Sequence, residues 1–174
     1  VDTVATGTNL KGDGAGWSTY RLGVNLIGNA VNCYTMFGKV GATYDCPLSV
    51  PPAYQCATPF GVNVAGTNPA FWPVANSDAT GYAQYDSWLT VGITGGDQSA
   101  AISSIGIDFA SWDENVPLVS DQVSGGAVFW MDPSAATASV SESRTMVVAQ
   151  LTLSESVADG HSLTRLHQMR FDAQ

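Results

Sequence analysis

Hydrophobic and polar residues alternate along several short stretches of the chain, with the two-residue period of a half-buried β-strand. Stretches with this alternation, or with a short apolar run, are 17–27, 31–37, 85–93, 105–109, 126–131, 146–153 and 163–171. Glycine, proline, asparagine and aspartate separate them, and no helical period lasts more than one turn. The pattern predicts an all-β protein with negligible helix, built as a single two-sheet β-sandwich of jelly-roll type with about eight strands.

The segment 85–112 is the expected centre of this fold, as two strands and the link between them. Apolar residues such as Leu89 and Ile107 fill one side of both strands, which predicts a buried face. The opposite side carries acids, small residues and one aromatic, among them Asp86, Trp88 and Asp108. We expect this second side to be a face available for binding or contact.

The chain length of 174 residues predicts one domain with a proper core. Residues 1–16 hold few apolar side chains and several glycines, and we expect a flexible or strand-donating arm there. Residues 17–174 would form the sandwich domain. Within it, the many prolines of 38–74 predict a long surface loop.

The composition is acidic, with a net charge of −9 at pH 7 and only 12% charged residues. Nucleic acid is excluded as a partner because phosphate binding needs clustered Lys and Arg. No apolar run approaches the roughly 20 residues that cross a bilayer, so membrane insertion is not expected. The sequence starts at Val1 rather than Met and uses few Lys, which predicts a secreted or cell-surface protein whose signal has been removed.

The three cysteines lie in and beside the expected loop. They are Cys33, Cys46 and Cys56, which permit one disulfide and leave one thiol over. A bridge from Cys33 to Cys56 joins two expected strands and is our first choice. A bridge from Cys46 to Cys56 stays open as the alternative.

Acidic residues gather where cations are missing. No Lys or Arg occurs between Lys39 and Arg144, although most of the acids lie there. One interpretation is that these acids are turn residues facing water, since Asp favours turns. The other is a calcium site, because calcium accepts carboxylate and carbonyl oxygens in flexible geometry. The candidate ligands, near the ends of the central strands, are Asp86, Asp97, Asp108 and Asp113.

Aromatic residues suggest a second kind of ligand. Flat aromatic rings stack on sugars, and Trp72, Trp88 and Trp112 are the expected exposed platforms of a carbohydrate site. The alternative is that these rings are core. Catalysis has weaker support, because no Gly-x-Ser-x-Gly motif occurs and the only candidate carboxylate pair is Asp86 with Asp108 across the central strands.

Several phrases of the sequence are similar to a known but uncharacterised domain. The chain resembles an all-β domain of secreted or surface proteins of algae and other protists over about residues 17–153, and the resemblance implies a surface setting without any activity or functional residue. The phrases that carry it are Cys33–Gly38, Pro51–Gln55, Pro59–Gly61, Asn68–Phe71, Tyr85–Gly92, Ser104–Phe109 and Gly126–Pro133.

We therefore expect a non-enzymatic extracellular or surface module with a structural or adhesive role. A carbohydrate-binding module, with surface glycans as partners and calcium as an aid, is the alternative, and a jelly-roll hydrolase is third. Self-association is expected through the arm 1–16. The strands 146–153 and 163–171 contain no Pro or Lys to guard a sheet edge, so the arm would add as a strand to a neighbouring copy and propagate a filament.

Overall fold

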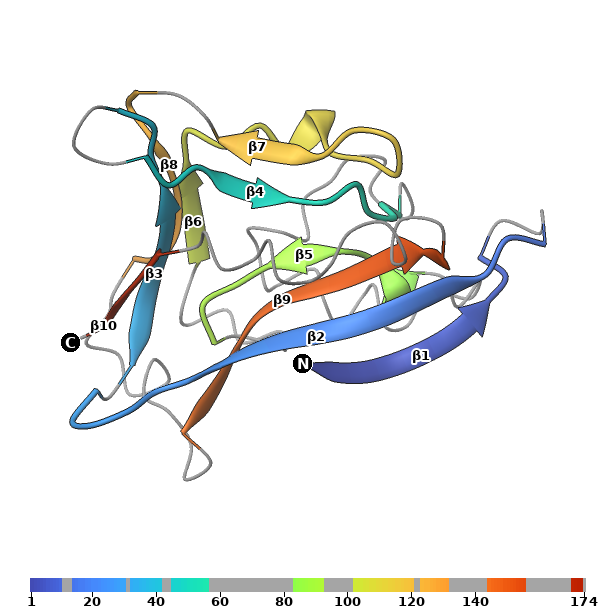
Figure 1. Ribbon diagram of the computed structural model, residues 1–174, viewed down its shortest axis with the longest axis horizontal. Helices are drawn as coiled ribbons and strands as arrows, with labels where there is room; N and C mark the ends of the chain where they lie inside the picture. The colour runs from blue at the N-terminus through green and yellow to red at the C-terminus, as the bar shows by residue number, and fades with distance from the viewer. Residues whose placement is uncertain are drawn as a thin grey trace.

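The computed structural model describes residues 1–10, 14–30, 32–41, 45–56, 83–92, 102–120, 123–131, 144–155 and 170–173. Strands dominate this part of the chain and all of their pairings are antiparallel, so the prediction of an all-β protein is confirmed (Figure 1). Between the strands stand two short 3-10 helices, η2 (Ala83–Tyr85) and η3 (Phe109–Ser111). The strands are β1 (Asp2–Thr8), β2 (Trp17–Asn25), β3 (Cys33–Gly38), β4 (Leu48–Val50), β5 (Trp88–Leu89), β6 (Ile102–Ile105), β7 (Leu118–Ser120), β8 (Gly126–Trp130), β9 (Thr145–Ser154) and β10 (Arg170–Ala173).

Sheet A has four strands in the order β1-β2-β9-β5. Its longest strand pairing is between β2 and β9 and runs from the pair Trp17 and Ser154 to the pair Asn25 and Thr145. Residues 148–153 of β9 are all buried, because this strand has a neighbour on each side and is covered on both faces. The prediction that 146–153 is an unguarded edge is therefore wrong, since the strand lies inside the sheet.

The N-terminal arm is part of the same sheet. β1 pairs with β2 of its own chain, and the register between them shifts twice along the seven residues of β1. Residues 2–8 of the arm thus form a strand of their own sheet, and the addition of this strand to a neighbouring copy stays a prediction. Most side chains of β1 are exposed, so backbone hydrogen bonds to β2 are its main attachment.

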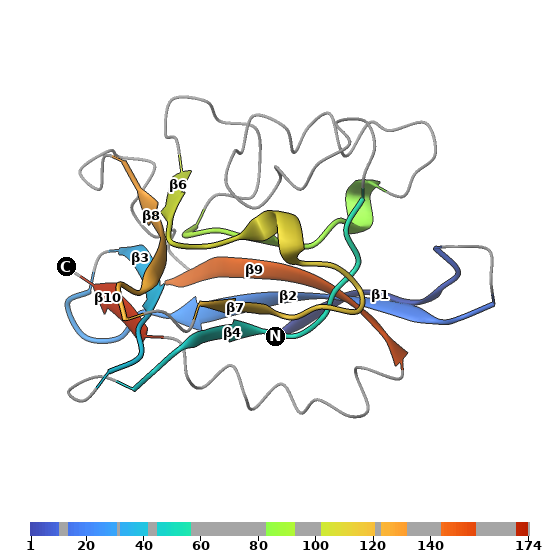
Figure 2. The ribbon, with the colours of Figure 1, turned by 90° about the horizontal axis from the view of Figure 1, so that it is seen from above.

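Sheet B has the order β10-β3-β8-β6. Its strands run steeply across those of sheet A, as Figure 1 shows, and Figure 2 shows sheet B at one end of the elongated sheet A. Met36 of β3, Val128 of β8 and Ile102 of the edge strand β6 belong to one core that also contains Leu89 and Leu151 of sheet A. The indole N–H of Trp130 in β8 donates to the backbone carbonyl of Val91, just after β5, and so joins the two sheets.

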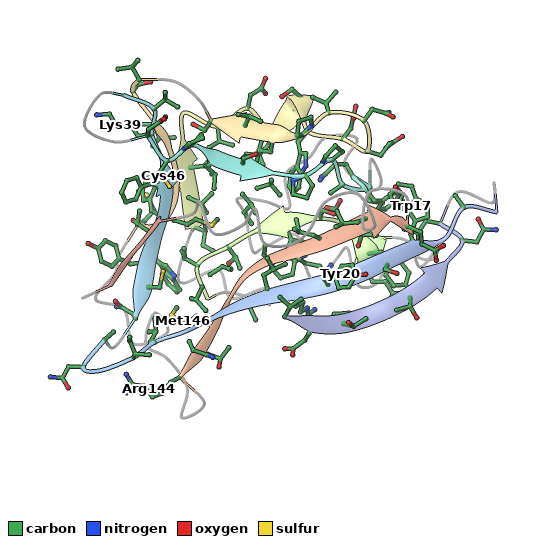
Figure 3. The ribbon with its side chains drawn as sticks, viewed as in Figure 1. Trp17, Tyr20, Lys39, Cys46, Arg144 and Met146 are labelled. Atoms are coloured by element: carbon green, nitrogen blue, oxygen red, sulfur yellow. The ribbon has the colours of Figure 1, made fainter. Side chains whose placement is uncertain are left out.

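The expected loop 38–74 is only partly a loop. Lys39 and Cys46 form a backbone bridge (N to O distances of 2.8 and 2.9 Å) that closes the turn after β3, and they lie together at that end of the strand in Figure 3. β4 follows between Pro47 and Pro51, pairs with β7, and buries Leu48 and Val50 completely. Residues 57–74 lie outside the described part of the chain.

The central segment 85–112 does not form the expected pair of neighbouring strands. β5 pairs with β9 in sheet A, whereas β6 pairs with β8 in sheet B. Residues 86–91 are all buried, so the side of Asp86 and Trp88 is not an exposed contact face. After β6 the chain enters η3, capped by Asp108, where an extended strand was expected.

Candidate functional site

The predicted sugar-stacking tryptophans are core residues in this structure. Trp88 and Trp112 are 6% and 1% exposed. The indole N–H of Trp112 donates to the carbonyl of Pro51 at 2.9 Å, and the guanidinium of Arg21 lies 5.9 Å from the centre of the Trp88 ring. The prediction that these two rings are exposed platforms is wrong, because β4, β5 and η3 bring them into the shared core. Trp72 lies outside the described residues.

Asp86 is a buried carboxyl beside the segment 53–56. Its Oδ1 accepts the backbone N–H of Cys56 at 2.8 Å, and its side chain is 5% exposed. Burial raises the pKa of Asp86 from 3.8 to about 7, against the lowering effect of the hydrogen bonds from the Cys56 and Ser87 backbones. The carboxyl therefore changes charge near neutral pH.

The polar residues around Asp86 hold strands and segments together. The side-chain amide of Gln150 donates to the carbonyls of Gln84 and Asp86 at 3.0 and 2.8 Å, while its oxygen accepts Nε of Arg21 at 3.1 Å. The hydroxyl of Ser87 accepts the backbone N–H of Thr152 at 2.9 Å. The partners of these buried side chains are backbone groups and Arg21, and such hydrogen bonds are what stability requires of polar groups in a core.

The other carboxylates of the predicted calcium site serve local turns. Oδ1 of Asp108 accepts the N–H of Ala110 at 3.1 Å and caps η3. Oδ1 of Asp113 accepts the N–H groups of Asn115 and Val116 at 2.7 and 2.8 Å. Asp97 is outside the described residues. Within the described ranges, no three His, Cys, Asp or Glu side chains form a group that could hold a metal ion. The expectation that Asp86 and Asp108 are cross-strand neighbours is wrong, because β5 and β6 belong to different sheets.

The predicted disulfide is also wrong, since no pair among the three cysteines lies at disulfide distance. Cys33 is fully buried at the start of β3, and its N–H donates to the sulfur of Met146 at 3.1 Å. Cys46 belongs to the bridge with Lys39, and Cys56 packs near the rings of Trp17 and Tyr54. Each cysteine thus sits in a different part of the fold.

An apolar surface lies on the side of sheet B away from the core. We call it the outer face and define it by Thr35, Phe37, Ser103, Ile105, Ala127 and Phe129. Backbone pairing aligns Phe37 with Ala127 and Ala127 with Ile105, and in the next row Thr35 with Phe129 and Phe129 with Ser103. Ile105 is 67% exposed, and Met131, the first residue after β8, is 64% exposed. On the β10 side, backbone pairing places Arg170 beside Phe37 and Asp172 beside Thr35, so charged residues border the outer face there.

One end of the outer face is hollowed. The hollow has a volume of about 280 Å³, and Phe37, Ile105, Ala127, Lys39 and Ser124 line it. The glycines at positions 38, 106, 125 and 126 also line it and contribute only backbone atoms. A Cβ on Gly126 would lie 2.3 Å from the Ser120 hydroxyl oxygen, so only glycine lets these strand ends approach so closely.

The alternation pattern did not reveal this surface. Phe37, Ile105 and Ala127 are far apart in the sequence and become neighbours only through the register of sheet B. The run 126–131 is apolar throughout, so its sequence does not show which side of the strand is exposed, and the outer face could not be predicted from it.

Comparisons with known proteins found no match among family models, curated proteins or solved structures. The described part of the chain also contains no helix that is both long and apolar enough to cross a membrane. The function of the protein is therefore inferred from the geometry of the outer face and its hollow.

Proposed function

We propose that this protein is a two-sheet β-sandwich of jelly-roll type that serves as a structural or adhesive module at the cell surface or outside the cell. Its contacts would be made through the outer face of sheet B. The observation that carries the proposal is the apolar row of Phe37, Ala127 and Ile105 on the outer side of sheet B, where Ile105 is 67% exposed. Exposed apolar patches on soluble proteins mark contact sites.

The use of the buried polar groups supports a structural role. Hydrogen bonds to backbone groups of neighbouring segments occupy the side chains of Asp86, Ser87 and Gln150. These side chains therefore stabilise the fold. The resemblance to a surface domain of algal and protist proteins points to the same setting. An enzyme would instead be expected to aim such groups into a cleft.

Adhesion can be tested with beads that carry the whole chain. We expect the coated beads to adhere to one another or to surfaces coated with protein or polysaccharide, and we expect Met131→Glu to reduce this adhesion. Ile27→Glu is the matched control, because Ile27 is 83% exposed on the turn between β2 and β3. Equal adhesion of both variants, or hydrolysis of a glycan substrate by the intact chain, would contradict the proposal.

A second candidate function is carbohydrate binding at the hollow. Phe37 offers an aromatic ring there, while Ser124 and Lys39 offer polar groups beside it. A glycan array read with and without chelator tests this candidate and the calcium hypothesis together. Binding that Ile105→Glu abolishes would place the sugar in the hollow, and sensitivity to chelator would add calcium.

A further inference from the structure

The hollow at the end of the outer face has a fixed shape, because glycine backbones pack closely around it. A Cβ on Gly106 would lie 2.3 Å from the carbonyl oxygen of Gly125, and a Cβ on Gly125 would lie 2.8 Å from that of Gly38. Gly106 and Gly125 also have φ angles of 66° and 74°, which side chains rarely allow. The hydroxyl of Ser120 donates to the carbonyl of Gly106 at 3.2 Å. The hollow is therefore already formed in the free protein, as most ligand sites are.

The larger side chains that line the hollow are mainly apolar. Phe37, Ala127 and Ile105 are neighbours in one row of sheet B. Ile105 is 67% exposed, so an apolar group in the hollow would remove part of this side chain from water. At about 30 Å³ per water molecule, the volume accommodates about nine waters or an organic ligand of about eleven non-hydrogen atoms. This lining favours a ligand with an apolar or aromatic body.

Two of the few cations of the chain border this hollow. The sequence has 6 Lys and Arg against 15 Asp and Glu. Lys39 lines the hollow just beyond the end of β3 (Figure 3), and backbone pairing places Arg170 beside Phe37. The described residues that line the hollow include no acid, and Asp172 pairs with Thr35, two residues farther from the hollow along β3. The charge at this place therefore favours an anion.

The backbone of Lys39 is held in position next to the hollow. Its N–H donates to the carbonyl of Cys46 at 2.8 Å, and its carbonyl accepts the N–H of Cys46 at 2.9 Å. A lysine ammonium is a compact charge with three donors on a flexible stem, so it can follow a carboxylate at the opening of the hollow. An exposed ion pair contributes little by itself, so the apolar body and the anion have to bind together.

We propose that the hollow binds a small organic acid, with its apolar or aromatic body against Phe37, Ile105 and Ala127 and its carboxylate beside Lys39. This inference goes beyond the proposed adhesive function, which is tested at Met131 and stands without it. For a ligand of about eleven non-hydrogen atoms in an open hollow, we expect a Kd on the order of 1 mM.

Phenylpropionate is the probe for this site, and its uncharged analogue phenylpropanamide is the matched control ligand. Each is titrated into the intact chain while the NMR shifts of the backbone N–H groups report where and how tightly it binds. We expect saturable shifts at Gly38, Lys39, Gly106 and Gly125. We expect phenylpropanamide to bind at the same place about three- to fivefold more weakly, because it lacks the charge.

Variants separate the contribution of the charge from that of the apolar lining. Lys39→Gln should remove most of the difference between the two ligands, and Lys39→Arg should restore it. Ala127→Leu, which fills part of the hollow, should weaken both ligands alike. The control Ile27→Glu, on a distant turn, should bind both ligands like the wild type.

The absence of saturable shifts up to about 20 mM phenylpropionate would overturn the proposal. Equal affinity of the wild type for the two ligands, or a Lys39→Gln variant that keeps their full difference, would overturn it as well. Shifts around the hollow with an uncharged glycan and none with phenylpropionate would favour the carbohydrate candidate instead. If phenylpropionate does not bind but Met131→Glu still reduces bead adhesion, the adhesive function stands and only this inference fails.

Discussion

Trp130 and Val91 join the two sheets through one hydrogen bond, from the indole N–H of Trp130 to the carbonyl of Val91. Both residues are buried, at 3% and 0% exposed. Because the donor is in sheet B and the acceptor follows the edge strand of sheet A, this contact fixes one sheet against the other.

Replacing Trp130 by Phe removes the donor and leaves the Val91 carbonyl buried without it. We expect the free energy of unfolding to fall by about 2–4 kcal/mol, from the unsatisfied acceptor and the lost ring volume. Trp112→Phe is a matched comparison, because its partner Pro51 is only partly buried and water can replace the donor. Denaturant unfolding of both variants gives the difference. If both variants lose the same free energy of unfolding, the hydrogen bond between the sheets contributes no more to stability than the one from Trp112 to Pro51.

Asp86 predicts a pH dependence of stability. Burial raises the pKa of this carboxyl to about 7 in the folded state, above its ordinary value of 3.8. The folded state therefore binds the proton more tightly, and the stabilisation is fully present below about pH 4. It is lost as the pH rises through about 7, by an amount of order 4 kcal/mol.

The substitution Asp86→Asn should flatten this dependence between pH 4 and 8, because the amide oxygen can still accept the N–H of Cys56 but cannot ionise. Asp108→Asn is the control, since Asp108 is an exposed cap and Asn also caps well. Urea unfolding at several pH values measures both variants. The control Asp108→Asn should show the same pH dependence of stability as the wild type. If both gain stability between pH 4 and 8, the prediction is contradicted.

Gly126 should tolerate no side chain. In Gly126→Ala the new Cβ would lie 2.3 Å from the Ser120 hydroxyl oxygen and 2.7 Å from the carbonyl oxygen of Gly106. We expect a loss of about 2–3 kcal/mol, partly recovered by adding Ser120→Ala. Gly16→Ala is the control, because its nearest contact is the flexible carboxylate of Glu155. Thermal unfolding that ranks Gly16→Ala as the worse substitution would show that the strand ends are looser than described.

Thiol labelling tests the absence of a disulfide. Under denaturing, non-reducing conditions we expect all three cysteines to react with a thiol reagent. In the folded protein, Cys46 and Cys56 should react before Cys33, because the side chain of Cys33 is fully buried. Mass spectrometry of the labelled peptides gives both results, and a pair of cysteines that stays unlabelled after denaturation would contradict them.

The two-residue period was sufficient to place β2, β3, β8 and β9, because each strand has a long enough run of alternating or apolar residues. It did not place the strands in sheets. Trp88 and Asp86 were expected on an exposed side, yet both are buried, because β4 and the segment 53–56 cover them. Alternation within one strand does not show whether another segment covers the more polar side of that strand. The outer face of sheet B was missed for the related reason that its rows combine residues from three distant strands.

The pairing of β2 with β9 sets the order in which the chain can fold. Thr19 and Thr152, whose hydroxyls are 2.8 Å apart, are separated by 133 residues. Closing so long a loop is slow, and a chain that emerges from the ribosome N-terminus first cannot complete sheet A until β9 has been synthesised. Until then the backbone groups of β2 and β5 that pair with β9 in the folded protein have no strand partner and stay open to water. Synthesis of the last third of the chain is therefore the period in which this protein most needs protection from aggregation.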